Sequence, residues 1–378
     1  MSSPLEGIRV VDFTRALSGP FATMTLADLG ADVVKIEHIK GGDDTRKWGP
    51  PFSDGVSTYF LSANRGKRSL ALDLKSAEHK ELVLRLIDVA DVVVENFRPG
   101  VMKKLGLDAD TLRKRKQDLV VCSISGFGQQ STRPGYDVVV QGMGGIVSLT
   151  GPIDGAPFKC ATSMADLVAG QNALQGILSA LVRRERTGKG AHVDVSMIDG
   201  MRAFLVYHAS SWLNAGVEPI RMGNHHPSVH PLCAYPSSDG WFNIAVGNDS
   251  LWAATCRTIG RVDLIEDERF RSNPDRVRNR EALDEILVAV FQQATTNEWE
   301  LKLGEAGVPV GPIHTVPQAL EDAVLVEHPH PQGGKSVRTV PLPFQMDGAA
   351  RATGRRAPAL GEHLDEVVED WLSEGKKA

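Results

Sequence analysis

The feature that most constrains the fold is a series of short, almost continuously apolar stretches separated by helical patterns. The apolar stretches predict buried strands, in chain order, over residues 8–13, 32–36, 69–72, 91–96 and 119–125. The segments between and after them predict helices over residues 21–29, 76–90, 101–105 and 109–116. Strands that lack polar alternation are buried on both faces, as in parallel βαβ units with helices on each side of the sheet. The first ~200 residues are therefore expected to form an α/β, doubly wound, Rossmann-like large domain.

A longer helix is predicted to begin at Met164, after a loop rich in glycine and proline. Its apolar spacing places Asp166 in the first turn, where free backbone N–H groups and the helix dipole favour negative charge. We therefore expect the pKa of Asp166 to be low. Ser163 and Asp166 also fit a capping box, in which the serine caps the helix and the acid reaches back. The spacing leaves open whether Asp166 is this structural cap or an ionised nucleophile.

The large domain is expected to extend over residues 1–215. Residues 191–197 are typical of a strand, and the helical pattern that follows them ends near residue 215. The composition then changes, because residues 216–231 are rich in glycine, proline, asparagine and histidine. Such a stretch predicts a linker or active-site loop.

Residues 232–330 predict a small α+β domain that begins with a hairpin turning at residues 237–240. Its further elements are helices near 250–259, 279–294 and 296–306, a short strand over 308–316 and a helix starting over 316–322. The remaining segment, 331–378, is rich in proline and arginine and ends in an amphipathic helix over 361–372.

Composition and charge narrow the class of protein. The 378 residues are 42% hydrophobic and 24% charged, and the net charge of −5 does not favour general nucleic-acid binding. The four cysteines are far apart and form no C-x-x-C pair, which predicts neither a disulfide framework nor a zinc knuckle. No signal-peptide pattern and no apolar run of ~18 residues is present, so we expect a cytoplasmic protein that does not cross a membrane.

Polar side chains follow the predicted strands, at the sheet edge where ligands of doubly wound folds bind. The cationic residues near these strand ends are Arg15, Arg65, Lys67, Arg68, Lys75, Arg98, Lys103 and Lys104. They suit a ligand with several phosphates, although solvated surface is the alternative interpretation. Neither G-x-G-x-x-G after the first strand nor G-x-x-x-x-G-K-[ST] occurs, so the sequence does not favour a dinucleotide or P-loop site.

Three histidines lie close together in the predicted linker, at His225, His226 and His230. No carboxylate or cysteine stands at ligand spacing from them, and Pro227 and Pro231 would interrupt any helix. The sequence therefore predicts no metal site.

Several further stretches follow one another in an order that identifies a family. In chain order they are GIRVVDFTRALSGPFATMTLADLGADVVKIE, NRGKRSLALDLK, DVVVENFRPGVMKKLG, ISGFGQ, RPGYDVVVQGMGG, the Asp166 region, RTGKGAHVDVSMIDG, SSDGWFNIAVGND, VPVGPI and APALGEHLDEV. They cover nearly the whole chain, and the ordered set resembles the family III CoA-transferases, also called the CaiB/BaiF family.

The resemblance implies an enzyme that moves coenzyme A from an acyl-CoA donor to a free carboxylic acid. Asp166 falls on the catalytic aspartate of the family, which forms mixed anhydrides and an aspartyl-CoA thioester. Coenzyme A is then a substrate, and no permanently bound cofactor is implied. Each tetrahedral step needs oxyanion donors, for which the backbone N–H groups at the helix start and the loop Gly223–Asn224 are candidates.

The same resemblance places CoA along the strand ends. The implied contacts are Ala16 and Leu17 near the thioester, His38, Leu72 and Lys75 near the nucleotide, Asn96, Phe97, Arg98 and Lys104 around the pantetheine and phosphates, and Tyr136 and Met197 in the active-site lining.

The residues at two positions bear on the substrate. Leu17 stands where a formyl-CoA transferase would carry glutamine, and the segment MGNHHPSVHP replaces its run of glycines, so formate and oxalate are not expected. Tyr136 and the small-domain segments resemble members that use succinyl-CoA and dicarboxylates. The alternative is an isomerase similar to the 2-methylacyl-CoA racemases, which carry a histidine base where this chain has Tyr136.

The resemblance also implies an interlocked homodimer, in which each chain threads through a ring made by the other. A chain that leaves the large domain near residue 215 and returns to it over residues 331–378 agrees with this arrangement. Two further alternatives are a non-catalytic CoA-binding protein, disfavoured by Asp166, and an NAD-dependent dehydrogenase, disfavoured by the missing glycine motif.

Overall fold

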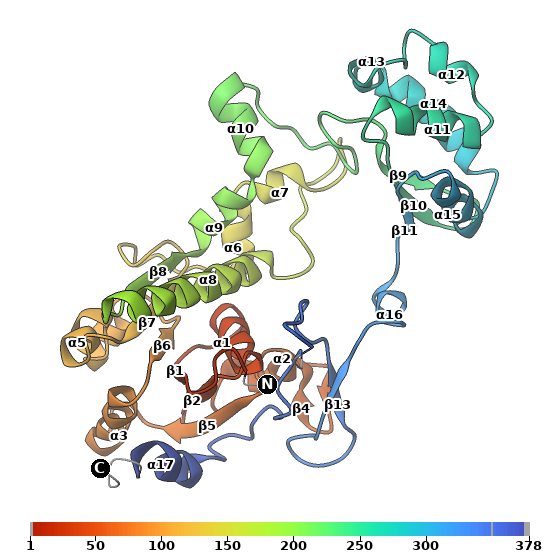
Figure 1. Ribbon diagram of the computed structural model, residues 1–378. Helices are drawn as coiled ribbons and strands as arrows, with labels where there is room; N and C mark the ends of the chain where they lie inside the picture. The colour runs from red at the N-terminus through yellow and green to blue at the C-terminus, as the bar shows by residue number, and fades with distance from the viewer. Residues whose placement is uncertain (1–2, 349–350, 374–378) are drawn as a thin grey trace. The chain divides into compact units, whose positions relative to one another are not determined.

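The computed structural model describes residues 3–348 and 351–373 (Figure 1). The chain divides into two compact units. The first unit comprises residues up to 146, residues 159–217 and the segment from 324 onward, and the second comprises residues 147–158 and 218–323. The sequence had suggested that residues 147–158 belong to the large domain, whereas they pack with the second unit.

The first unit is built on a six-stranded sheet with the order β5-β2-β1-β6-β7-β8, in which every neighbouring pair is parallel. Its strands are β1 (Arg9–Asp12), β2 (Asp32–His38), β5 (Lys67–Leu72), β6 (Val92–Glu95), β7 (Val120–Ser125) and β8 (His192–Ser196). Counted along the chain, this is the order 3-2-1-4-5-6 of doubly wound folds. The predicted α/β fold with a parallel sheet is confirmed.

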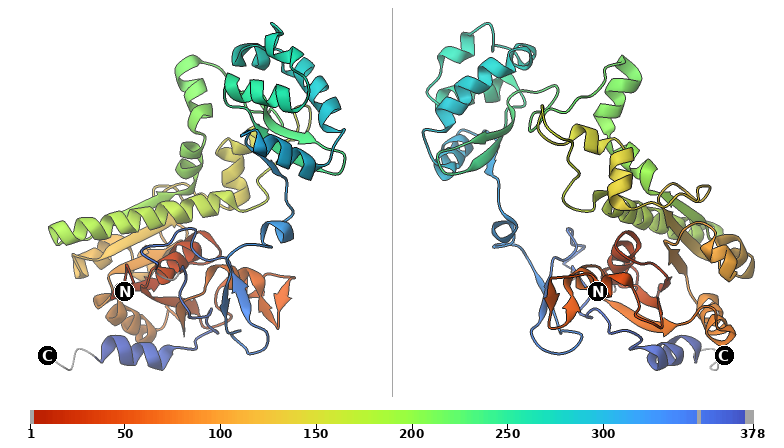
Figure 2. Two further views of the ribbon diagram at one scale, coloured as in Figure 1. Left: turned by 45° about the vertical axis from the view of Figure 1, so that its right-hand side comes forward. Right: turned by 180° about the vertical axis from the view of Figure 1, so that it is seen from behind.

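Helices cover both faces of this sheet (Figure 2). One face packs against α1 (Ser18–Asp28), α8 (Met164–Thr187) and α9 (Met197–Phe204). The other packs against α3 (Ala77–Asp88), α4 (Val101–Leu105), α5 (Ala109–Arg115) and the C-terminal α17 (Leu364–Leu372). The strand order changes direction between β1 and β6, so the chain opens a crevice at their carboxyl ends.

The prediction of one long helix that ends near residue 215 is wrong. The structure divides it into α9 and α10 (Val206–Ala215). Val206 has a φ of 41°, which an L-residue in a continuous helix does not adopt, so the helix axis breaks there. Short elements that the sequence did not predict in this unit are η1 (Asp44–Lys47), β3 (Phe52–Ser53), β4 (Val56–Ser57), α2 (Thr58–Ala63), α6 (Asp137–Met143), β12 (Val326–His328) and β13 (Val337–Thr339).

The second unit contains a three-stranded antiparallel sheet with the order β11-β10-β9. The strands are β9 (Leu232–Pro236), β10 (Trp241–Ala245) and β11 (Val310–Pro312). The helices are α11 (Asp249–Thr258), α12 (Asp263–Glu266), α13 (Asn273–Arg278), α14 (Arg280–Phe291), α15 (Thr296–Glu305) and α16 (Val316–Ala319), while α7 (Ile146–Leu149) begins at the boundary. The hairpin turn over residues 237–240 is where the sequence predicts it.

No helix in residues 3–348 and 351–373 is both long enough and apolar enough to cross a membrane.

Candidate active site

Helix α8 brings Asp166 to the crevice, but not through the predicted capping box. Ser163 is the N-cap residue, yet its side chain does not accept a hydrogen bond from the helix. Its hydroxyl instead interacts with the phenol of Tyr59, from α2, and lowers the pKa of that phenol. The capping-box prediction is therefore wrong, because Ser163 makes no cap hydrogen bond and a carboxylate from another helix binds the first turn.

The first turn of α8 is capped by Asp137, at the start of α6. The backbone N–H of Ala165 donates to Asp137 Oδ1 at 2.8 Å, and Gln141 Nε2 donates to Asp137 Oδ2 at 2.8 Å. Gln141 Oε1 in turn accepts from the backbone N–H of Cys160 at 2.9 Å. A carboxylate from outside the helix thus fixes the loop before α8 and stabilises its N-terminus.

The pKa of Asp166 is raised from 3.8 to about 7, so the prediction of a low pKa is wrong. Burial at the cavity wall raises it most, the negative charge of Asp137 raises it further, and a hydrogen bond from Ser18 lowers it. A helix dipole contributes at most about 2 kcal/mol in a partly buried geometry, which is about 1.5 pKa units. Loss of water and a neighbouring carboxylate therefore outweigh the helix terminus.

The loop after β1 is held against Asp166 by Asn96. The Asn96 side chain accepts from the backbone N–H of Arg15 and donates to its carbonyl, both at 2.8 Å. Its Nδ2 also lies 3.4 Å from the hydroxyl of Ser18, which hydrogen-bonds Asp166. Between these residues Ala16 has a φ of 61°, a strained conformation for a residue with a Cβ. The loop is thus fixed by Asn96 in a shape that its sequence does not favour.

Gly170 allows α8 to approach this loop. A Cβ at that position would lie 2.7 Å from the carbonyl oxygen of Ser18 and 3.1 Å from the ring of Phe21. Only glycine leaves room for α8 to pack so closely against the start of α1. Gly170 therefore sets how closely α8 approaches the loop that carries Ser18.

Asp166 lines a cavity of about 420 Å³ at the carboxyl ends of β1, β6 and β7. The lining residues are Arg15, Ala16, Ser18, Asp44, Trp48, Tyr59, Asn96, Phe97, Arg98, Pro99, Ile124, Ser125, Gly126, Arg133, Pro134, Gly135, Tyr136, Asp137, Val138, Lys159, Ser163, Asp166 and Met197. All of them belong to the first unit. The cavity lies where a doubly wound sheet binds its ligand.

The cavity brings together about half of the residues that the resemblance assigned to the CoA site. Those that line it with Asp166 are Ala16, Asn96, Phe97, Arg98, Tyr136 and Met197. Those outside its lining are Leu17, His38, Leu72, Lys75 and Lys104. Among these, His38 and Leu72 are paired at the ends of β2 and β5, and the Leu72 side chain is buried in the core. Their role at the nucleotide stays a prediction.

Three of the cationic residues that the sequence analysis placed at a phosphate site are instead buried and paired, so the prediction is wrong for these three. Arg65 contacts Asp28 at 2.6 Å, Lys67 contacts Asp12 at 3.1 Å, and Arg68 binds Asp32. Charged groups that lose their water need such partners. Sequence spacing could not reveal them, because each carboxylate lies in a different element from its cation.

Other cations remain at the mouth of the cavity. Arg98 is exposed, and the guanidinium of Arg15 lies 5.3 Å over the ring of Phe97. Arg133, which the sequence analysis did not single out, lies 4.8 Å over the ring of Phe127. Arg133 precedes Tyr136 in the RPGYD stretch, so a signal was present, whereas nothing in the sequence indicated Trp48 or Tyr59.

The N–H groups at the start of α8 are largely engaged. Met164 donates to Thr162 O at 2.7 Å, and Leu167 donates to Ser163 O at 3.1 Å. Together with Ala165, three candidates for oxyanion stabilisation already have acceptors. Gly223–Asn224 belongs to the second unit, and its oxyanion role stays a prediction.

The fold and the cavity define an α/β enzyme with a partly buried carboxylate at its ligand crevice. The sequence model of CoA-transferase family III matches residues 5–364. A succinyl-CoA:glutarate CoA-transferase from Mus musculus is 38% identical, over 98% of this chain and 86% of that protein. An acetyl-CoA:oxalate CoA-transferase from Acetobacter aceti is 44% identical, over 84% of this chain and 82% of that protein.

A solved structure of a CaiB/BaiF family protein from Brucella suis has a TM-score of 0.87 and 40% identity, covering 98% of this chain and all of that one. The chain belongs to family III of the CoA-transferases, and the resemblance seen in the sequence is confirmed. It is an acyl-CoA:carboxylate CoA-transferase.

Proposed function

We propose that the enzyme transfers CoA from succinyl-CoA to a dicarboxylic acid, with Asp166 as the covalent nucleophile. The observation that carries the nucleophile is the position of Asp166 in the cavity without a cation to neutralise it. No described Lys, Arg or His forms an ion pair with Asp166, and a pKa of about 7 leaves roughly half of it ionised at neutral pH. A desolvated carboxylate in that state is a reactive nucleophile.

The proposed cycle breaks and forms one bond at a time. An Asp166 oxygen attacks the thioester carbonyl of the donor, the C–S bond breaks, and a mixed anhydride and CoA thiolate result. The thiolate attacks the Asp166 carbonyl, which releases the donor acid and leaves an aspartyl-CoA thioester. The acceptor carboxylate then attacks this thioester to give a second anhydride, and the freed thiolate attacks the acceptor carbonyl. This last step restores the Asp166 carboxylate with no net transfer of protons.

The residues around Asp166 support the binding steps of this cycle. Ser18 hydrogen-bonds the carboxyl of Asp166 and orients it, and Asn96 fixes the loop that carries Ser18. Arg98 and Arg133 line the cavity and suit the phosphates of CoA or the far carboxylate of a dicarboxylic acid. The 38%-identical succinyl-CoA:glutarate enzyme favours succinyl-CoA as donor, while the 44%-identical acetyl-CoA:oxalate enzyme makes oxalate a required member of the acceptor screen.

A 2-methylacyl-CoA racemase-like activity is the rival interpretation. A carboxyl group with a pKa of about 7 is suited to proton transfer as well as to nucleophilic attack. Against it, the position expected to hold a histidine base is Tyr136, whose side chain is 67% exposed. Exchange of the α-proton of a 2-methylacyl-CoA in D₂O, without transfer to an acid, would favour the racemase.

The test of the nucleophile is intact-protein mass spectrometry after incubation with succinyl-CoA. A CoA adduct is the expected result, and hydroxylamine should displace its CoA and leave a hydroxamate on the peptide that contains Asp166. Asp166→Asn is the matched variant, because it keeps the shape of the side chain and removes the nucleophile. A mapped adduct on another residue, or an adduct that persists in Asp166→Asn, would contradict the assignment.

We also propose that two chains form the interlocked homodimer of the family. Large apolar side chains on and beside α10 are exposed within one chain, among them Val206, Trp212, Leu213 and Val217. Exposed apolar surface of this kind marks an interface. Light scattering behind a sizing column should give twice the mass of one chain, and a monomer at micromolar concentration would contradict the dimer. The four free thiols agree with the proposed cytoplasmic location.

A further inference from the structure

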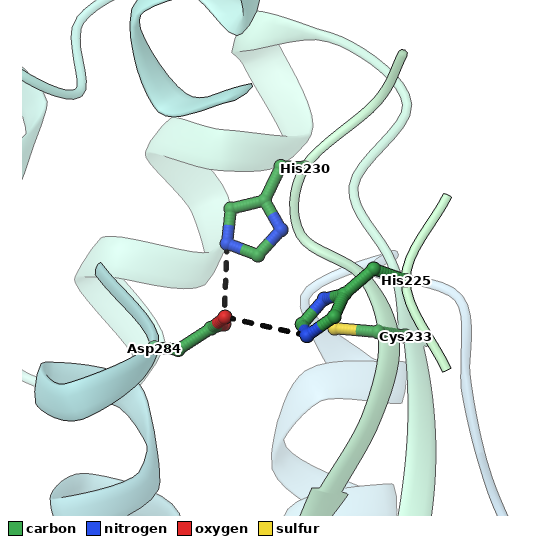
Figure 3. A group of neighbouring side chains, drawn as sticks. All are labelled: His225, His230, Cys233 and Asp284. Carbon is green, nitrogen blue, oxygen red and sulfur yellow. Dashed lines mark ion pairs between the residues drawn. The ribbon is translucent and has the colours of Figure 1, made fainter. Parts of the chain in front are cut away.

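The second unit contains a compact cluster of possible metal ligands that is separate from the Asp166 cavity. Its members are His225, His230, Cys233 and Asp284, and one ligand atom from each lies within 4.8 Å of the others (Figure 3). Both imidazole rings are turned toward Asp284, and the Cys233 sulfur lies beside the His225 ring. The sequence argument against a metal was that no carboxylate or cysteine lies at ligand spacing. Folding supplies both, because Cys233 is on β9 and Asp284 is on α14.

Two of the distances between ligand atoms are close to those of a tetrahedral ion. His230 Nε2 lies 3.2 Å from Asp284 Oδ1, and His225 Nε2 lies 3.6 Å from Asp284 Oδ2. Zinc with bonds of 2.0–2.3 Å separates its ligand atoms by roughly 3.3–3.8 Å. The two imidazole–carboxylate distances therefore need only small side-chain adjustments to accept the ion.

The cluster is buried and short of hydrogen bonds. The His230 side chain has no exposed surface, and Cys233 is 4% exposed. His230 Nε2 faces Asp284 Oδ1 at 3.2 Å, while among the described residues His225 Nδ1 and His230 Nδ1 have no hydrogen-bond partner. Buried polar groups without partners are rare in folded proteins, so imidazole nitrogens with free hydrogen-bonding capacity mark this cluster as a candidate ligand site.

Surrounding groups hold the Asp284 carboxylate and the backbone of His230 in place. Tyr235 donates its hydroxyl to Asp284 Oδ1 at 2.5 Å, which orients the carboxylate. Arg276 Nε donates to the carbonyl of His230 at 2.9 Å, and the N–H of His230 donates to Asn273 Oδ1 at 3.2 Å. Metal ligands in proteins are oriented by outer groups of this kind.

We propose that His225, His230, Cys233 and Asp284 bind one Zn²⁺ ion in a closed, structural site. Two imidazoles, a thiolate and a carboxylate form a ligand set that zinc prefers over calcium or magnesium, which bind oxygen. Cys233 releases its proton to solvent when the Zn–S bond forms. Four protein ligands leave no open position, so the ion fixes the segment 225–233 to α14 and takes no part in catalysis.

The test is the metal content of the full-length enzyme, purified without a polyhistidine tag from zinc-supplemented cells. Elemental analysis should find about one zinc per chain. Exchange for Co²⁺ should give visible d–d bands of a tetrahedral ion and the near-ultraviolet absorption of a cobalt–thiolate bond. Zinc at background level together with no such cobalt spectrum would overturn the proposal, whether or not any variant folds.

The matched variants are Cys233→Ser and Cys256→Ser. Both remove a buried thiol from the same core, but only Cys233 belongs to the cluster. Zinc content and the cobalt–thiolate absorption should be lost in Cys233→Ser and kept in Cys256→Ser. A strong chelator should lower the Tm of the Cys256→Ser variant by roughly 5 °C or more and leave Cys233→Ser unchanged. Metal that remains in Cys233→Ser with an unaltered spectrum would contradict the site. None of these readings depends on Asp166 or on CoA transfer.

Discussion

Two groups of acidic side chains in the first unit differ in what neutralises them. On the α1 face of the sheet, Asp12 lies 3.1 Å from Lys67 and Asp43 lies 2.9 Å from Lys35, with all four side chains fully buried. In the cavity, the neighbour of Asp166 is a second carboxylate rather than a lysine. The pKa of Asp43 is lowered to about 2, whereas that of Asp166 is raised to about 7.

The difference shows how one fold gives carboxylates opposite roles. A buried carboxylate beside a lysine stays charged and fixes structure, since Lys35 also donates to the carbonyl of Thr14 at 2.7 Å and Asp43 accepts from the N–H of Ala16 at 3.3 Å. A desolvated carboxylate beside another carboxylate changes its protonation near neutral pH. The first group therefore holds the loop, and the second has the protonation behaviour that the proposed nucleophile requires.

The largest expected effect is on turnover in Asp166→Asn. CoA transfer should fall by about a thousandfold or more, because the amide cannot form the anhydride. Thermal stability should not fall, since the substitution removes a charge that burial disfavours. Asp88→Asn, at an exposed carboxylate on α3, is the control and should transfer CoA at the wild-type rate. Transfer by Asp166→Asn within tenfold of wild type would remove the distinction between the two groups.

Substitutions in the buried lysine–carboxylate pairs should change the free energy of unfolding. Lys35→Met leaves Asp43 buried without its cation and should lower the free energy of unfolding by about 3–5 kcal/mol, measured by urea denaturation. Arg115→Met breaks the exposed pair with Asp88 and should cost at most about 1 kcal/mol. An equal loss of unfolding free energy in the two variants would contradict the argument that burial makes the Lys35–Asp43 pair more important.

The pH dependence of transfer should follow the raised pKa of Asp166. As pH falls below about 7 the carboxylate is protonated, so kcat/KM should drop about tenfold per pH unit. Asp137→Asn removes the neighbouring negative charge, and the midpoint should move down by about one pH unit. A wild-type midpoint near 4 would show that Asp166 resembles the paired carboxylates.

The same pKa predicts a change in stability. Its folded value of about 7 lies above the ordinary 3.8, so the folded state binds the proton more tightly than the unfolded state. The contribution of Asp166 is therefore fully present below about pH 4 and is lost as pH rises through about 7. The free energy of unfolding, measured as a function of pH, should lack this pH-dependent contribution in Asp166→Asn. The Asp88→Asn variant should retain it.

The smallest expected effect is at the mouth of the cavity. Arg98→Ala should raise the KM for acyl-CoA about tenfold with little change in kcat, because an exposed cation contributes similar binding energy in the ground state and transition state. Arg85→Ala, exposed on α3 and outside the cavity lining, should leave KM unchanged. An unchanged KM in Arg98→Ala would remove this arginine from the CoA site.

Local pattern was sufficient for most elements of the first unit. The strand over residues 32–36 appears as β2 because its nearly continuous apolar residues are buried on both faces of the sheet. The helix over 101–105 appears as α4 because its apolar residues recur at helical spacing. The break at Val206 was not predictable, because helical spacing continues through it. The two-residue strands β3 and β4 carry too few residues for a periodic pattern.

The sequence predicted those residues of the candidate site that directly follow a strand. Asn96 and Arg98 directly follow a strand, so their place at the crevice was implied by the parallel sheet. Tyr59 reaches the cavity from α2, a short helix without a clear pattern, and its contact with Ser163 joins residues about a hundred positions apart.

The sequence by itself determined the alternation of strands and helices along the first unit, the family, and the position of Asp166 in the first turn of α8. Only the tertiary structure decided that the pKa of Asp166 is raised, that Arg65 and Lys67 are paired inside the protein, and that Cys233 and Asp284 meet two histidines. The physical reason is that periodicity reports which face of an element is buried. Desolvation, charge pairing and ligand geometry depend on which distant side chains share that buried space.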